Sequence, residues 1–257
     1  MPTGAITGYI DVAQLVLYAF WIFFAGLIIY LHRENKREGY PLESDRTDRT
    51  NRVQVQGYPA VPPPKTFNLP HGGTVQAPSG KRDARAIKAQ PTAGFPGAPL
   101  APTGNPMLDG VGPAAYAERA DVPDTTVEGG PRILPLRVAT DHALESRDVN
   151  PIGKPVLGAD GKSGGTVVDA WVDTSEAFLR YLEVEVSPGG RRVLLPINFT
   201  RIGADAVRVK AILGHQFADV PGLKNPDRVT LLEEDMICGY YGGGTLYATP
   251  DRQEPLI

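Results

Sequence analysis

The pattern of hydrophobic and polar residues divides the chain into an apolar N-terminal segment, an irregular middle and a C-terminal part with strand-like alternation. Residues 12–31 form a run of 20 positions without a formal charge. At about 1.5 Å per residue, a helix of this length spans about 30 Å, the thickness of the hydrocarbon core of a bilayer. The pattern therefore predicts a membrane-spanning helix at 12–31 that follows a short N-terminal segment at 1–11.

Two other kinds of segment share this apolar pattern, namely a signal peptide and a buried core helix. A signal peptide needs a basic region before its apolar core, and residues 1–11 contain no Lys or Arg. The segment that follows, 32–57, is basic, with Arg33, Lys36, Arg37, Arg46, Arg49 and Arg52. Because basic flanks remain on the cytoplasmic side of a membrane, we expect a periplasmic N-terminus and a cytoplasmic main domain.

The middle of the chain, 58–133, is rich in residues that interrupt regular structure. Between Tyr58 and Pro113 there are 12 prolines, 8 glycines and only 7 charged residues. Proline removes a backbone donor and breaks helices, so this composition excludes a long helix. We expect an extended segment with little regular structure that lies across another surface; a free flexible linker is the alternative.

The C-terminal part, 134–257, has the pattern of closely spaced short strands. In 179–186, Leu182, Val184 and Val186 alternate with polar or amphipathic residues, which predicts a half-buried strand. Other strand-like runs occur at 164–173, 191–198 and 206–212. The turn residues Ser187-Pro188-Gly189-Gly190 predict a hairpin between 179–186 and 191–198. Together these runs favour a small antiparallel barrel or sandwich.

One short helix is expected near the C-terminus. Asn225 is a suitable cap, Pro226 suits the first helical position, and Gly239 is a suitable stop. The acidic run Glu233-Glu234-Asp235 is expected either to close this helix or to pair with arginines of a partner.

Composition and charge exclude several classes of function. A single cysteine, Cys238, excludes an internal disulfide, and the four scattered histidines form no HExxH motif and no cluster with cysteine, which argues against a dedicated zinc site. Residues 114–257 carry 15 basic and 21 acidic residues, which argues against nucleic-acid binding. Gly161-Lys162-Ser163 lacks the leading glycine of a phosphate-binding loop, and no nucleophile motif occurs. The sequence therefore indicates a scaffold with ionisable groups rather than an enzyme.

Several stretches closely resemble the H subunit of the photosynthetic reaction centre of purple bacteria. The match runs through most of the chain, and its clearest parts are REGYPLE at 37–43, PKTFNLPHGG at 64–73, APTGNPMLDGVGPAAYAERAD at 101–121, NPIGKPV at 150–156, RYLEVEV at 180–186 and LLEEDMICGYYGGGTLYATP at 231–250. The resemblance implies a single N-terminal transmembrane α-helix and a mostly β cytoplasmic domain. That domain would contain a small antiparallel PRC-type barrel and a short C-terminal helix.

The resemblance also implies a role without catalysis of its own. The chain would cap the cytoplasmic face of the L and M subunits, stabilise the complex, shield the quinones and assist proton delivery to the secondary quinone. It would bind no cofactor itself, because bacteriochlorophyll, bacteriopheophytin, quinones and a non-haem iron are expected in L and M. Membrane lipids, a cytochrome subunit and a light-harvesting antenna are further expected partners, in the bacterial inner (intracytoplasmic) membrane.

The resemblance assigns candidate proton-transfer residues. Asp173 and Glu176 match family positions on the proton pathway, and Arg180 is expected to tune their charge. The alternative is that both acids belong to a solvated connection between strands. Some relatives have a histidine pair before the segment at 132–138, which is absent here, so Asp124 and Glu128 are the candidate proton entrance.

Two other functions remain open from the residues. One is a membrane-tethered PRC-barrel adaptor unrelated to photosynthesis, because similar barrels bind protein and RNA. A membrane-bound hydrolase is a more distant alternative.

Overall fold

The computed structural model describes residues 4–40, 57–81, 83–95 and 98–253, and nothing below concerns the remaining positions. The chain forms two compact units, Met1–Asp83 and Ala84–Ile257, which are described separately. We call the second unit the β-rich domain. Three basic residues of the expected juxtamembrane segment, Arg46, Arg49 and Arg52, lie outside the described residues.

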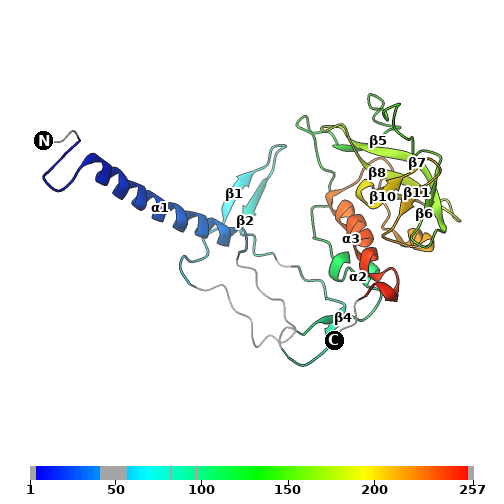
Figure 1. Cartoon of the computed structure of the whole chain (residues 1–257), viewed down its shortest axis with the longest axis horizontal. Coiled ribbons are helices and arrows are strands. Elements are labelled where there is room, and N and C mark those ends of the chain that lie inside the picture. Colours follow the sequence, from blue (N-terminus) through cyan, green and yellow to red (C-terminus); the bar gives the residue numbers. More distant parts are fainter. Residues whose placement is uncertain (1–3, 41–56, 82, 96–97, 254–257) are drawn as a thin grey trace. The chain divides into compact units, whose positions relative to one another are not determined.

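The first unit contains one long helix and a small hairpin (Figure 1). These elements are α1 (Val12–Arg37), β1 (Lys65–Asn68) and β2 (Thr74–Ala77). The β-rich domain contains the other strands and helices. Its strands are β3 (Ala89–Pro91), β4 (Leu100–Pro102), β5 (Ile133–Pro135), β6 (Pro155–Leu157), β7 (Ser163–Asp173), β8 (Phe178–Val186), β9 (Arg192–Pro196), β10 (Thr200–Ile202) and β11 (Val207–Val209). Its helices are α2 (Pro106–Asp109), η2 (Gly112–Ala114), η3 (Ile197–Phe199), η4 (Gly214–Asp219), α3 (Leu231–Tyr247) and η5 (Pro250–Arg252).

The expected membrane span at 12–31 lies inside α1, which continues to Arg37. Asp11 caps the helix, because its side chain accepts a 2.8 Å hydrogen bond from the backbone N–H of Gln14. Among the described residues, α1 is the one helix long and apolar enough to cross a membrane, with a mean hydropathy of 2.3 over its apolar window. None of that window is buried inside the chain's own fold, so α1 presents apolar side chains on all sides, as a lipid-facing helix does.

The end of α1 is tied to the segment that follows. Lys36 and Arg37 are both buried. The Lys36 ammonium donates to the carbonyls of Gly57 and Pro59, and Arg37 Nη1 donates to the carbonyl of Pro63 at 2.6 Å. Two basic side chains at the end of the helix thus bind backbone carbonyls, which satisfies buried charges that would otherwise be costly.

The proline-rich middle contains more paired structure than the sequence predicts. β1 and β2 form an antiparallel hairpin in the first unit, and β3 pairs with β4 in the β-rich domain. Each strand is only three or four residues long, since prolines stand at or beside their ends. The segment is therefore extended over most of its length but includes two short two-stranded pairs.

Seven strands of the β-rich domain form one curled sheet in the order β10-β11-β6-β7-β8-β9, with β5 also paired to β7. The expected hairpin between 179–186 and 191–198 is confirmed as β8 and β9. The prediction of an entirely antiparallel sheet is wrong, because β6 and β11 run parallel, with Val156 opposite Val207. Among the described strands, no ladder joins β9 to β10, so the sheet is not closed into a barrel by strand pairing.

The prediction that β8 is only half buried is wrong. Leu182 and Val184 point into the core as expected, but Tyr181 and Glu183 on the other face are also buried. Arg137 covers that face and donates to Glu183 Oε2 at 2.5 Å, and the same oxygen accepts a 2.9 Å bond from Trp171 Nε1. Paired charges and hydrogen bonds therefore allow a polar face to be buried.

The helix near the C-terminus is real, but both of its predicted ends are wrong. It begins after Thr230, whose hydroxyl accepts from the N–H of Glu233, while Glu233 accepts from the N–H of Thr230 in return. Asn225 instead closes a tight turn by accepting from the N–H of Asp227. Gly239 lies inside the helix, and glycine is needed there because a Cβ would stand 2.8 Å from the carbonyl oxygen of Ala114.

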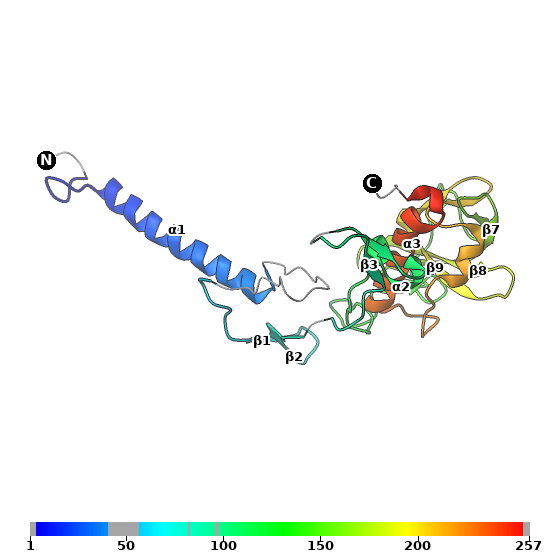
Figure 2. The same ribbon diagram turned by 90° about the horizontal axis from the view of Figure 1, so that it is seen from below.

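The core of the β-rich domain lies between the sheet and α3. α3 packs against η2, α2 and β9, and both views place it beside the sheet (Figure 1, Figure 2). The largest fully buried side chains are Trp171, Tyr241, Phe217, Leu182, Leu194, Leu195, Ile212 and Ile237. The same packing positions the ionisable groups described next.

Candidate functional site

Three of the predicted site residues meet around an arginine that the sequence analysis did not single out. Arg132 Nε lies 2.8 Å from Asp173 Oδ2, and Arg132 Nη2 lies 2.5 Å from Glu176 Oε1. Asp124 Oδ2 lies 3.6 Å from Arg132 Nη1. Arg180 joins from β8, with Nη2 3.4 Å from Asp173 Oδ2. We call these five residues the Arg132 cluster.

The pairing of β5 with β7 brings this cluster together. Ile133 is opposite Asp173 in the β5–β7 ladder, so Arg132 stands where β7 ends. The carbonyl of Arg132 accepts from the N–H of Thr174 at 2.9 Å and from its hydroxyl at 3.0 Å. Ala177, in the following turn, has a φ of +49°, a conformation that is uncommon without glycine. The turn returns the chain into β8, which carries Arg180.

Asp173 is the buried centre of the cluster and has no exposed surface. Its Oδ1 atom accepts from Arg132 Nε at 2.9 Å and from the N–H groups of Ser175 and Glu176 at 3.0 and 3.2 Å. Burial by itself raises the pKa of this carboxyl, but the hydrogen bonds and charge of its donors outweigh burial, so the pKa lies below its ordinary 3.8. Asp173 is therefore ionised at neutral pH in this chain.

Two buried polar atoms of the cluster lack aligned partners. Among the described residues, Asp173 Oδ2 and Arg180 Nε make no hydrogen bond that satisfies normal geometry. They belong to an ion pair whose Nη2 and Oδ2 atoms are 3.4 Å apart. Buried polar atoms are normally satisfied, so this pair is a suitable position for an ordered water.

Asp124 and Glu128, the predicted entrance, are placed differently. Asp124 contacts Arg132, and its side chain is 42% exposed. Glu128 is exposed in the turn at 126–130, where the hydroxyl of Thr126 and the backbone lower the pKa of its carboxyl. No contact in the described part of the chain joins Glu128 to Arg132.

A further carboxylate near the cluster, Glu234, has a pKa that is shifted in the opposite direction to the pKa of Asp173. Its Oε2 atom accepts from the Tyr181 hydroxyl at 2.7 Å. Burial raises the pKa of Glu234 above its ordinary 4.5, although Tyr181, Arg180 and Arg119 act in the other direction. The charge of Asp124 also raises this pKa. Glu234 thus interacts electrostatically with two members of the Arg132 cluster.

The acidic run that contains Glu234 opens α3 rather than closing it, so that expectation is wrong. Glu233 completes the capping box, and Asp235 pairs with Arg119 of the same chain at 3.4 Å. Acidic residues in a first turn interact favourably with the positive end of the helix dipole.

The raised pKa of Glu234 predicts a pH-dependent stability. The stability that this group contributes is fully present below its unfolded pKa of 4.5 and is lost as the pH rises through the higher folded value. Glu234→Gln, which keeps a hydrogen-bond acceptor for Tyr181, should therefore flatten the fall in stability above about pH 4.5. Denaturant midpoints of the full chain in detergent at a series of pH values measure this slope.

Tyr181→Phe provides the opposing variant, because it removes a donor that lowers the Glu234 pKa. Its stability should fall more steeply with pH than that of the parent chain. Equal slopes for all three proteins would mean that Glu234 is not the group responsible.

The described residues contain no group of three or more His, Cys, Asp or Glu side chains placed to hold a metal ion. What the Arg132 cluster can do chemically is to hold ionised carboxylates next to fixed guanidinium groups. One buried oxygen, Asp173 Oδ2, lies 2.8 Å from Arg132 Nε and 3.4 Å from Arg180 Nη2, but has no aligned hydrogen-bond donor among the described residues.

Comparison with known families agrees with the resemblance noted from the sequence. Residues 4–138 match the model for the photosynthetic reaction centre H-chain N-terminal region. Residues 144–216 match the PRC-barrel domain. The first match includes α1 and the proline-rich middle, which the hypothesis of an unrelated adaptor leaves unexplained. The chain therefore belongs to the H-chain family of the photosynthetic reaction centre, a structural subunit family that associates with the L and M subunits.

Proposed function

We propose that this chain caps the cytoplasmic face of the L and M subunits, stabilises the complex, shields its quinones from water and assists proton delivery to the secondary quinone. The family match supports the subunit role. The observation that carries the proton role is Asp173, a fully buried carboxylate with one oxygen that lacks an aligned donor among the described residues. In this proposal the pigments, quinones and non-haem iron are held by L and M.

The proposal places the N-terminus in the periplasm and the β-rich domain in the cytoplasm of the bacterium, with one crossing of its inner membrane. No Lys or Arg precedes α1, whereas Lys36 and Arg37 stand in its last turn. Positive residues stay on the cytoplasmic side during membrane insertion, which supports this orientation.

Within the cluster, exposure suggests the direction of proton movement. The side chains of Glu176 and Asp124 are 58% and 42% exposed and can exchange protons with solvent. Asp173 is buried behind them, and Oδ1 is occupied by three donors. In this proposal the proton is held at Oδ2, which lies 2.8 Å from Arg132 Nε but lacks an aligned hydrogen bond, and an ordered water at hydrogen-bond distance connects it to the next group.

The donors around Asp173 set the energy of this step. Because Arg132 and the backbone N–H groups of Ser175 and Glu176 lower the pKa of Asp173, a proton rests there only briefly, at a cost of about 1.4 kcal/mol for each pKa unit below the ambient pH. Covering the cluster with partner subunits removes water and raises carboxyl pKa values, which reduces this cost. Glu234, whose pKa is already raised, serves as a nearby site that holds a proton more readily.

The test replaces both acids by amides in the assembled reaction centre. Asp173→Asn with Glu176→Gln should slow the proton-coupled second electron transfer to the secondary quinone by about 100-fold, the lower end of what a positioned acid–base group contributes. Initial charge separation needs no proton and should be unchanged. Flash-induced absorbance changes measured as a function of pH separate the two steps.

Asp148→Asn is the matched control, because Asp148 is an exposed carboxylate outside the cluster. It should leave both steps unchanged. If the double variant transfers the second electron at the parent rate across the pH range, the cluster is not on the proton pathway and the solvated-connection alternative holds.

A further inference from the structure

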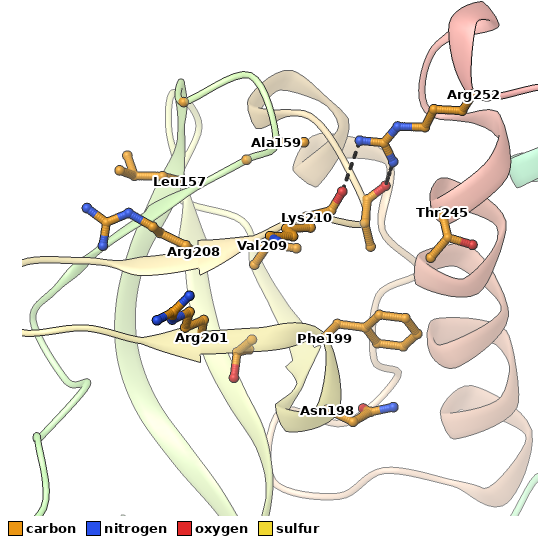
Figure 3. Close-up of a pocket in the computed structure, with 14 residues that line it drawn as sticks. Leu157, Ala159, Asn198, Phe199, Arg201, Arg208, Val209, Lys210, Thr245 and Arg252 are labelled. Carbon is orange, nitrogen blue, oxygen red and sulfur yellow. Dashed lines mark hydrogen bonds between the residues drawn. The ribbon is translucent and has the colours of Figure 1, made fainter.

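A second site with a different chemistry lies at the other end of the curled sheet. It is a cleft of about 880 Å³ between the β10–β11 pair, the loop at 158–161 and the C-terminal end of α3 (Figure 3). Its volume falls in the range of small-molecule sites, which is about 300–1,000 Å³. Neither the Arg132 cluster nor Glu234 lines this cleft.

The charged residues that line the cleft are all positive. They are Arg201, Arg208, Lys210 and Arg252, and no Asp or Glu is among the described lining residues. The β-rich domain as a whole has an acidic excess in its sequence, so a concave basic surface here is a local exception. Concentrated positive charge in a concave surface favours an anionic ligand.

Two of the arginines face each other across strands. Arg201 of β10 is opposite Arg208 of β11 in an antiparallel register, so both side chains leave the same face of the sheet. Like charges directly opposite each other destabilise a strand pair. Asp205 compensates Arg208 at 2.9 Å, whereas Arg201 has no carboxylate within ion-pair distance among the described residues. An anion between the two guanidinium groups would relieve this repulsion.

The opposite rim of the cleft is rigid. Arg252 of η5 donates to the carbonyls of Ala211, Gly244 and Lys210 at 2.6–2.9 Å, so it joins the end of α3 to the strand region (Figure 3). Its position is thus fixed before any ligand arrives, and its charge has no paired carboxylate among the described residues. Preorganised groups of this kind reduce the cost of ordering on binding.

Apolar side chains also line the cleft between the Arg201–Arg208 pair and Arg252. Phe199 projects from η3 toward α3 and stacks on Tyr241 with ring centroids 5.6 Å apart (Figure 3). Leu157, which is opposite Arg208 in the β6–β11 ladder, and Val209 add aliphatic side chains to the lining. A ligand that fills this space therefore needs an apolar or ring-shaped body attached to its anionic group.

We propose that this cleft binds a phosphate ester, with its phosphate between Arg201 and Arg208 and its organic body against Phe199. A planar guanidinium group binds phosphate through two parallel hydrogen bonds, which Arg201 can supply, whereas Arg208, whose Nη1 and Nη2 already donate to Asp205, adds positive charge beside it. An acidic peptide adding to the sheet edge is disfavoured, because β10 is only three residues long. The ester can be a soluble phosphate or the headgroup of an anionic lipid.

The test measures binding to the full chain in detergent and to the assembled complex. ADP and inorganic pyrophosphate are the soluble probes, and vesicles with phosphatidic acid are compared with vesicles of phosphatidylcholine alone. Arg201→Ala with Arg208→Ala should weaken binding by about tenfold or more, because charge-assisted bidentate hydrogen bonds are lost. Lysine at both positions keeps the positive charge but not the planar guanidinium donors, and should give an intermediate loss of binding affinity.

Arg147→Ala is the matched control, because Arg147 is 90% exposed and lies outside the cleft. It should bind the probes like the parent chain. Saturable binding of ADP, tighter than that of pyrophosphate and dependent on Arg201 and Arg208, supports a soluble ester, and the same dependence seen only with phosphatidic acid vesicles supports a lipid headgroup.

Three results would overturn the proposal. The first is the absence of saturable binding of any phosphate probe at millimolar concentration. The second is a double alanine variant that binds the probes with the same affinity as the parent chain. The third is preference for a polyglutamate peptide over every phosphate probe. Circular dichroism of each variant shows whether the sheet is intact, and the lysine variant keeps the test valid if the alanine variant does not fold.

Discussion

Asp173→Ala is expected to destabilise the β-rich domain by about 2–3 kcal/mol, which is near the lower end of the cost of removing one partner from a buried ion pair. Asp173 is fully buried, and its loss leaves Arg132 and two backbone N–H groups without their acceptor. The side chain of Arg132 is 25% exposed, so water recovers part of its hydration, and the cost is reduced accordingly.

The pH dependence of this loss follows from the lowered pKa of Asp173. A carboxyl whose folded pKa is depressed contributes stability that is present above its unfolded pKa of 3.8 and is lost as the pH falls through the folded value. The difference between Asp173→Ala and the parent chain should therefore shrink in acid. Chemical denaturation of the full chain in detergent at neutral and acid pH measures this difference.

Asp173→Asn and the exposed Asp148→Ala are the comparison variants. The amide keeps an acceptor for the N–H groups, so Asp173→Asn should cost less than Asp173→Ala, and Asp148→Ala should be close to neutral because its side chain is exposed. A loss of stability in Asp173→Ala that is equal at neutral and acid pH would show that packing, and not the ion pair, explains the effect.

Gly165→Ala is expected to have the other large effect, a loss of about 3 kcal/mol or more from combined strain and overlap. Gly165 has a φ of +148°, which side chains rarely adopt. A Cβ at this position would stand 2.2 Å from the carbonyl oxygen of Glu185 on the paired strand β8. Because that atom belongs to the backbone of the sheet, the overlap can be relieved only by separating β7 from β8.

Gly161→Ala is the matched control for this variant. Gly161 also has a positive φ, +72°, but a Cβ there would meet nothing within 4 Å. It should cost about 1 kcal/mol, from backbone strain alone. Thermal unfolding of both variants separates strain from steric overlap. If the two losses were equal, the close approach of β7 to β8 at Gly165 would be incorrect.

The predicted elements that were confirmed depend on local patterns. The apolar run at 12–31 lies within α1, and the turn at 187–190 joins two strands as expected. Hydrophobic length and turn chemistry act within a few residues of chain, so they can be read directly from the sequence. The resemblance to the H-chain family depends on motifs of the same local kind, and the family match agrees with it.

The predictions that were wrong depend on contacts between distant residues. Asn225 and Pro226 satisfy the local rules for a helix start, yet Thr230 is the cap because its capping box with Glu233 is also tied to Lys224. Gly239 looked like a helix stop, but it allows Ala114 to approach α3. Glycine has both uses, and the sequence pattern does not distinguish them.

By itself, the sequence determined the apolar helix, the main hairpin and the acids Asp173 and Glu176 as candidates. Only the tertiary structure decided that Arg132 joins them, because the β5–β7 pairing connects residues 41 positions apart. The same holds for the parallel β6–β11 pair and for the facing arginines of the cleft. Register between distant strands is set by the packing of the whole core, whereas helix length and turn type are set by neighbouring residues.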